Sequence, residues 1–232
     1  DPDSTVEEVN TDASGMSETL TLDTPPLELS MQPSEVQPYA EYTIQVTAKG
    51  YRPINISGIE VFSGQLSLQE IRMDAEETTE SMTDNIVIPA HTLFAEYPPK
   101  IAEAEIKPVT ETGEIVLSRV VIPEYVIVHD GAPSDPTARD YYVRYRDYIK
   151  NVASSEIYST WPDATIRANV LAIMSFTLNR VYTEWYRNKG YSFTITSSTA
   201  YDQKFMYGRN IYQSISDVVD EMFQNYLSLS LI

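Results

Sequence analysis

The sequence predicts an α+β fold, in which a small antiparallel β-sandwich precedes a mainly helical domain with short strands. In the first half, short runs of alternating apolar and polar residues lie between turn residues, which is typical of half-buried strands. From about residue 145 the apolar residues recur at helical spacing instead. Charge follows the same division: residues 1–120 contain 22 acidic and 6 basic side chains, and residues 121–232 contain 12 and 10.

The composition argues against several classes of protein. The 232 residues include no cysteine, which excludes disulfide scaffolds and zinc-thiolate modules. A net charge of −18 would repel a phosphate backbone, so we expect no nucleic-acid partner. The longest apolar stretch, residues 168–176, is far shorter than the ~20 residues of a membrane span, so we expect none. The chain starts at Asp1 without a signal segment, and we expect that its native amino end has been removed.

The strands of the first half are predicted in order along the chain. Alternation at residues 19–22, 42–46 and 65–71, with prolines and glycines between the runs, predicts the antiparallel sandwich. The pattern over 42–73 resembles the carboxypeptidase-regulatory-like, prealbumin-like β domain. Because only ten residues precede the segment TDASG at 11–15, we expect a partial domain, truncated at its start, over residues 1–73.

The next segment is predicted to separate two domains. Residues 74–85 contain five acidic side chains, three threonines and no aromatic residue, which predicts a solvated linker. A short β run follows at 86–88, and residues 115–128 are extended and rich in Val and Ile. His91 and His129, the two histidines, have no ligand spacing around them, so we interpret both as ordinary loop or strand residues and expect no metal.

Helices dominate the remainder. Tyr148, Ile149 and Val152 share one face of a short helix, and Pro162 with Asp163 is typical of a helix start. A long helix over 163–189 with a glycine cap, a short strand and a closing amphipathic helix are then predicted from the residues Ile166, Val170, Ile173, Thr177, Val181, Gly190, Phe193, Ile195, Ile215, Val218, Val219, Met222, Phe223 and Tyr226.

Two motifs in this half resemble a known family. The stretch YIKNVASSEIYSTWPDATIRANVLA at 148–172 is similar to the core of the stage II sporulation protein D family, and TSSTAYDQKFMYGRN from Thr196 is similar to its second signature. One extra residue separates Gln203 from the Tyr-Gly pair of that signature. The longer match is closer to the clostridial spore cortex-lytic, germination-specific lytic transglycosylases, which place such a domain after an acidic pro-region. The resemblance covers residues 120–228 firmly and 11–119 loosely.

The resemblance implies an enzyme that cleaves peptidoglycan glycan strands between muramic acid and glucosamine without water and without a cofactor. Glu156 matches the catalytic glutamate of the family. Its neighbours Ile157, Tyr158 and Trp161 could desolvate it, as a general acid requires. From spacing alone, a helix-end carboxylate bound to backbone amides or to an arginine is the alternative interpretation.

The second motif and the residues flanking Glu156 are expected to form the saccharide site. Tyr201, Gln203 and Tyr207 are placed against the sugar, together with Trp161 and Ser155, since rings stack on sugar faces and an amide both donates and accepts. A turn with a buried tyrosine is the alternative for Tyr207. Asp202 is the candidate second carboxylate, and facing Glu156 at ~5–10 Å it would indicate a hydrolase. Some relatives carry Cys and His in this loop, where this chain has Ser, Thr and Ala, so we expect no zinc.

The resemblance also implies a precursor located in the spore cortex or extracytoplasmic cell wall. Residues 1–119 are then the pro-region, in which the β domain is followed by the acidic linker and pro-region segment 74–119, and 120–232 are the catalytic domain. Arg119, Val120 and Val121 form the region that an activating protease would cut. A non-catalytic wall-binding or scaffold protein is the alternative function. An amidase is disfavoured because it needs zinc or a cysteine nucleophile. The sequence leaves the oligomeric state open.

Overall fold

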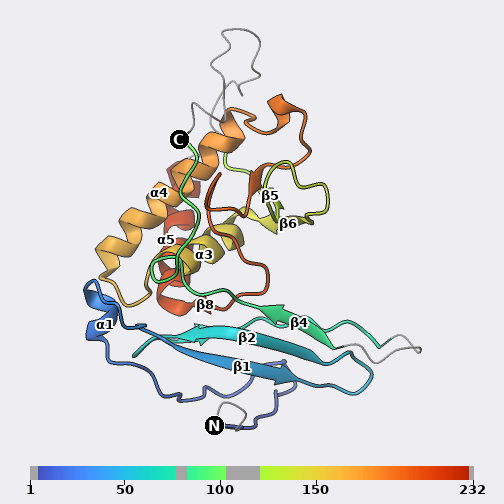
Figure 1. Cartoon of the computed structure of the whole chain (residues 1–232), viewed down its shortest axis with the longest axis vertical. Coiled ribbons are helices and arrows are strands. Elements are labelled where there is room, and N and C mark those ends of the chain that lie inside the picture. Colours follow the sequence, from blue (N-terminus) through green and yellow to red (C-terminus); the bar gives the residue numbers. More distant parts are fainter. Residues whose placement is uncertain (1–4, 77–82, 103–120, 230–232) are drawn as a thin grey trace.

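The computed structural model describes residues 5–76, 83–102 and 121–229, so Arg119 and Val120 of the predicted cleavage region lie outside the described residues. The described chain is α+β, as predicted, and its long helices all belong to the second half (Figure 1). In chain order the elements are α1 (Glu28–Met31), β1 (Ala40–Val46), β2 (Ile54–Val61), β3 (Ser67–Leu68), β4 (Asp84–Val87), β5 (Tyr125–His129), β6 (Asp140–Arg144), α3 (Tyr145–Glu156), α4 (Asp163–Tyr182), the 3-10 helix η1 (Arg187–Lys189), β7 (Ile195–Thr196), β8 (Ile211–Tyr212) and α5 (Gln213–Leu229).

The described part of the first half contains one three-stranded mixed sheet rather than the predicted two-sheet sandwich. β1 and β2 pair antiparallel, and β4 joins the other edge of β2 in parallel. Ile54, Ile56 and Ile59 of β2 are buried with Ile88 in one apolar cluster. Gly58 permits this close packing, because a Cβ at its φ of +77° would lie 2.1 Å from the carbonyl oxygen of Ile88.

Two strand predictions for this half need correction. The run at 19–22 forms no strand, and the run at 65–71 forms only the two-residue β3, which pairs with β8 of the second half. The described ends of the predicted solvated linker, 74–76 and 83–85, are exposed or partly exposed, and an aspartate from each end pairs with one arginine that precedes β2. Arg52 binds Asp74 at 3.0 Å and Asp84 at 3.4 Å, and Asp84 begins β4.

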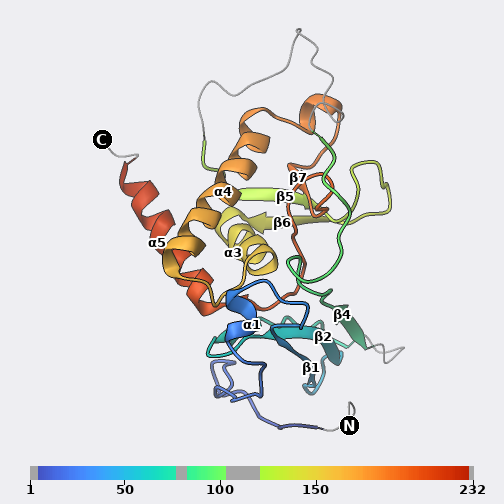
Figure 2. The same ribbon diagram turned by 60° about the vertical axis from the view of Figure 1, so that its left-hand side comes forward.

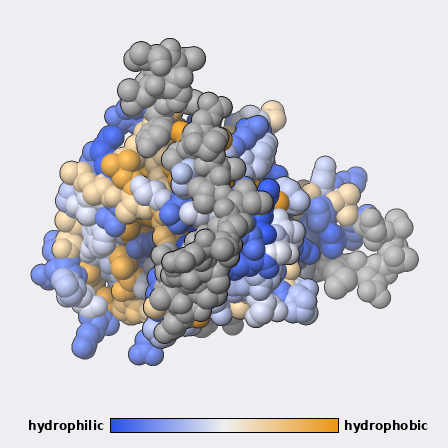
Figure 3. Space-filling model, turned by 90° about the horizontal axis from the view of Figure 1, so that it is seen from above, coloured by the Kyte–Doolittle hydropathy of each residue, from blue (hydrophilic) through white to orange (hydrophobic). Residues whose placement is uncertain are grey.

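The helices of the second half follow the predicted periodicity. α3 begins at Tyr145 and α4 at Asp163, directly after Pro162. α4 ends at Tyr182 rather than 189, and η1 then leads to Gly190, which caps the segment at φ +85° as predicted. Apolar residues gather on the left of the view in Figure 3, the side on which α4 lies in Figure 1, and Leu171 of α4 remains 46% exposed.

One hydrophobic core joins the two halves. Tyr39 and Phe62 of the first half are buried in the same cluster as Tyr158 and Tyr212 of the second, and the ring centroids of Phe62 lie 5.2 Å from Tyr158 and 5.4 Å from Tyr212. In both ribbon views, the sheet that contains β2 lies directly below the helices α3 and α5 (Figures 1 and 2). The β-sheet therefore supports the helical half directly.

Candidate active site

Glu156 is the last residue of α3, and its carboxylate faces the loop that contains the second sequence motif. The helix ends there because Ile157 adopts an extended conformation, with φ −133° and ψ 147°. The backbone N–H of Lys204 donates to Glu156 Oε1 at 2.7 Å. Desolvation raises the pKa of Glu156 to about 7, against the opposing effects of the Lys204 N–H and of the Lys100 charge. The residue nevertheless keeps partial solvent exposure.

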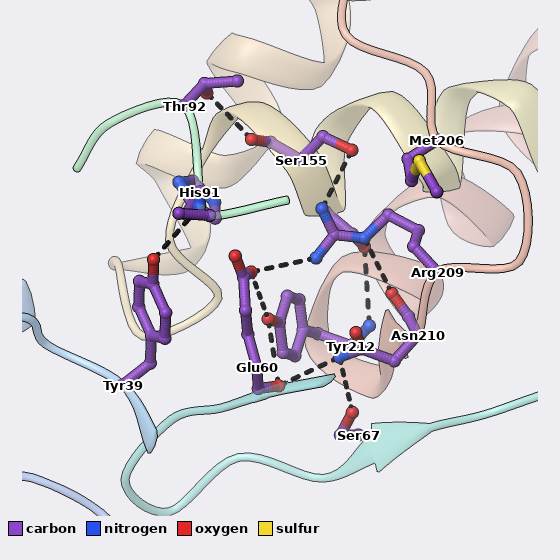
Figure 4. A network of polar contacts seen from close by, with 12 residues as sticks. Tyr39, Glu60, Ser67, His91, Thr92, Ser155, Met206, Arg209, Asn210 and Tyr212 are labelled. Carbon is purple, nitrogen blue, oxygen red and sulfur yellow. Dashed lines mark hydrogen bonds and ion pairs between the residues drawn. The ribbon is translucent and has the colours of Figure 1, made fainter. Parts of the chain in front are cut away.

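Arg209 holds the last turn of α3 from the opposite side (Figure 4). Its guanidinium donates to Ser155 Oγ at 2.9 Å, to Glu60 Oε2 at 3.1 Å and to the carbonyl oxygen of Asn210 at 3.0 Å. Glu60 belongs to β2 and also accepts a hydrogen bond from the Tyr212 hydroxyl. The residue next to Glu156 is thus linked through one arginine to the sheet of the first half.

Asp202 anchors the loop after β7 and has no free oxygen for chemistry. Arg180 donates to its Oδ1 at 2.8 Å, and both side chains are essentially unexposed. Its Oδ2 accepts from the Tyr186 hydroxyl at 2.6 Å and from the hydroxyl and backbone N–H of Thr196. A carboxylate with four donors in the interior is structural, so we do not retain Asp202 as the second carboxylate.

Gln203 is also internal. Its Oε1 accepts from the Tyr148 hydroxyl at 3.2 Å and from the Thr177 hydroxyl at 2.8 Å, while its Nε2 donates to the carbonyl oxygen of Ile173. Both ends of the amide are therefore engaged by protein groups. The placement corrects the expectation of a saccharide contact, because Gln203 fastens the loop to α3 and α4 and sets the position of Lys204.

The other predicted contact residues lie at different depths. Ser155 is buried, with its hydroxyl donating to the carbonyl oxygen of Asn151, so it supports the helix end rather than an open surface. Trp161 packs edge-on against Tyr158 and donates its indole N–H to the carbonyl oxygen of Ser30 in α1. Tyr201 is partly exposed, and Tyr207 is 43% exposed.

A segment that the sequence analysis placed in the pro-region lies across this site. We name residues 88–102 the strap. Thr92 donates to the carbonyl oxygen of Ser155 at 2.8 Å, Lys100 to that of Asp202 at 2.9 Å, and the N–H of Ile101 to that of Ala200 at 2.7 Å. The strap therefore contacts both the residue before Glu156 and the loop that faces it.

A small pocket lies between the strap and the helix end. The strap supplies one wall, and the other comes from Ser155, Lys204, Met206 and Arg209. The pocket has no room for a water molecule in this form. Glu156 is not among the residues that line this pocket, although its neighbours Ser155 and Lys204 are. The groove expected between the long helix and the loop 197–208 therefore stays a prediction.

Both histidines occupy structural positions. His91 is buried in the strap, where desolvation lowers its pKa to about 3 and keeps the ring neutral. His129 pairs through Nδ1 with Asp140 at 2.7 Å and stacks on Phe193. The described part of the chain contains no group of three or more His, Cys, Asp or Glu that could hold a metal ion.

Comparisons with protein-family models, with curated proteins and with solved structures find no match to this chain. Among the described residues, every helix is too short or too polar to cross a membrane. The site itself therefore carries the functional argument.

Proposed function

We propose that this protein is a peptidoglycan lytic transglycosylase that cleaves the glycosidic bond between muramic acid and glucosamine, with Glu156 as the single general acid and base. The environment of Glu156 is the observation that best supports this proposal. Its pKa of about 7 leaves a large protonated fraction near neutral pH, and the side chain is not fully buried.

The proposed reaction needs one carboxyl group used twice. Protonated Glu156 gives its proton to the bridging oxygen as the bond from that oxygen to the muramic C1 breaks. The muramic C6 hydroxyl then attacks C1, and its proton returns to the Glu156 carboxylate, so the 1,6-anhydro product forms without water. The engagement of Asp202 by four donors supports a mechanism with one carboxylate rather than the hydrolytic pair.

We further propose that the intact chain is a precursor, for action in the spore cortex or extracytoplasmic wall, and that the strap holds it inactive. The strap bonds to Ser155 and to the loop opposite Glu156, and the pocket that it lines together with Ser155 and Lys204 has no room for a water molecule. A protease that cuts within Arg119–Val121 would free the carboxyl end of the strap, and Val121 is 43% exposed. The remaining candidate, a non-catalytic wall-binding protein, predicts binding without any product.

The test compares Glu156→Gln with the wild-type chain after both are nicked at 119–121. We expect glycan cleavage to fall by at least about 100-fold, because the substitution removes the titratable proton and keeps the side-chain shape. Mass spectrometry of peptide-free glycan would count anhydro-muramic ends. Glu124→Gln, at the exposed glutamate directly before β5, is the matched control and should cleave normally. A Glu156→Gln variant that forms anhydro ends at the wild-type rate would refute the assignment.

A further inference from the structure

Two tyrosine rings form an open aromatic surface at the end of the loop that faces Glu156. Tyr207 from this loop and Tyr141 from β6 stack with their centroids 4.4 Å apart and their planes 8° from parallel. Tyr207 is still 43% exposed although Tyr141 covers one of its faces. The remaining face and edge of Tyr207 therefore meet solvent. We name Tyr141 and Tyr207 the tyrosine platform.

A short stretch of chain connects the tyrosine platform to Glu156. Lys204 bonds through its backbone N–H to Glu156, and Phe205 is buried against the Tyr148 ring at 5.8 Å. Phe205 also lies 6.3 Å from Tyr141, ring to ring. Since three residues of extended chain span only about 10 Å, Tyr207 is held within the reach of a few sugar units from Glu156.

Polar groups surround these rings, as saccharide recognition requires. The Arg139 guanidinium lies 5.9 Å from the centroid of Tyr141. Asp130 is close enough to influence the pKa values of both Tyr141 and Lys204. Flat rings present an apolar face to the C–H groups of a sugar, while neighbouring charged side chains and the tyrosine hydroxyls bind its hydroxyl and amide groups.

The strap leaves this surface uncovered. Its hydrogen bonds described above go to Ser155, Ala200 and Asp202, on the Glu156 side of the loop, whereas Tyr207 remains exposed. A glycan strand can therefore reach the tyrosine platform while the strap is still bonded to Ser155 and to the loop.

We propose that the tyrosine platform is a saccharide-binding subsite that holds an N-acetylated glycan strand on the intact chain, before cleavage begins. This inference rests on the proposed function for its ligand class, and it adds Tyr141 as a contact residue and an order of events. Binding precedes removal of the strap, and the bound strand is then already aligned along the loop toward Glu156.

The test measures binding to the intact, uncut chain. The probe is a hexasaccharide of N-acetylglucosamine, titrated by isothermal calorimetry and by NMR. We expect Tyr207→Ala and Tyr141→Ala each to weaken binding by about 10-fold or more, and Tyr141→Phe to retain binding because the ring remains. Tyr142→Ala is the matched control: Tyr142 is 76% exposed and, one residue further along β6, points to the other side of the strand.

The outcomes separate this inference from the proposed function. Platform variants that bind like the wild-type chain, an intact wild-type chain that does not bind the hexasaccharide, or a Tyr142→Ala variant that loses as much affinity would overturn the inference, whether or not Glu156 cleaves glycan. Binding that depends on the platform, in a protein whose nicked form releases no anhydro ends, would keep the inference and refute the transglycosylase. Tyr207→Ala is the more informative of the two variants. Tyr207 is the more exposed ring, so its removal should leave the melting temperature unchanged, and a loss of binding then reports on the contact and not on folding.

Discussion

The elevated pKa of Glu156 makes a prediction about stability that needs no substrate. In the folded chain the pKa is about 7, compared with an ordinary value of 4.5, so the fold favours the protonated carboxyl. The resulting stabilisation is fully present below pH 4.5 and is lost as the pH rises to about 7. A difference of about 2.5 pH units corresponds to about 3 kcal/mol, an upper figure because the side chain is partly exposed.

Replacing Glu156 with Gln imitates the protonated form at every pH. We expect equal stability of variant and wild type near pH 4.5, and a variant that is more stable by up to about 3 kcal/mol at pH 8. For a chain of this size that corresponds to a melting temperature higher by roughly 6–12 °C.

Thermal unfolding of the intact chain, followed by circular dichroism at both pH values, measures this difference, with Glu124→Gln as the control. A melting-temperature difference between Glu156→Gln and wild type that is the same at pH 4.5 and pH 8 would show that Glu156 is not desolvated, and the general-acid argument would lose its basis.

Two further predictions concern the first half of the chain. Glu60→Ala leaves the Arg209 charge buried without its partner, and we expect a loss of about 3–5 kcal/mol of unfolding free energy in denaturant titrations. Glu41→Gln, at the exposed residue paired with Glu60 across the sheet, should change little, and equal losses in the two variants would contradict the importance of the buried pair. Nicking within Arg119–Val121 is expected to raise the rate at which the protein cleaves cortex glycan. Added salt is not expected to raise the activity of the uncut chain, because salt screens charge repulsion between the acidic chain and the anionic wall but leaves the bonded strap in place. Activation by salt alone would indicate electrostatic repulsion instead.

Local sequence signals predicted the elements that position Glu156. The helical spacing of Tyr148, Ile149 and Val152 identified α3, and the Pro-Asp start of α4 fixed the end of the turn between them. These signals operate within a few residues, so they can be recognised without knowing what packs against them. The α+β class was predicted from the change between alternating apolar residues in the first half and helical spacing from about residue 145.

Long-range contacts could not be predicted in this way. Asp202 and Gln203 are polar residues in a polar loop and appeared accessible, yet their partners Arg180, Tyr148 and Thr177 lie 22 to 55 residues away and enclose them. Composition carries no information about such pairing. β4 begins at Asp84, inside the predicted linker, and two of the five carboxylates of the linker, Asp74 and Asp84, pair with Arg52, which composition alone does not indicate.

The two parts of the proposed pro-region have different relations to the site. The sheet shares a hydrophobic core with the helices, and through Glu60 and Arg209 it supports Ser155, so its removal would expose Tyr158 and Tyr212 and leave a buried cation unpaired. The strap is attached in two ways: Ile88 and His91 at its start are buried, whereas Lys100 and Ile101 near its end bond to backbone carbonyl oxygens of the loop after β7. We therefore expect that activation, if the chain is the proposed precursor, releases only the later part of the strap around Lys100 and Ile101, while the sheet, Ile88 and His91 stay bound. A fragment consisting of 121–232 alone should accordingly be poorly folded rather than hyperactive, and the nicked chain should remain a complex of its two pieces.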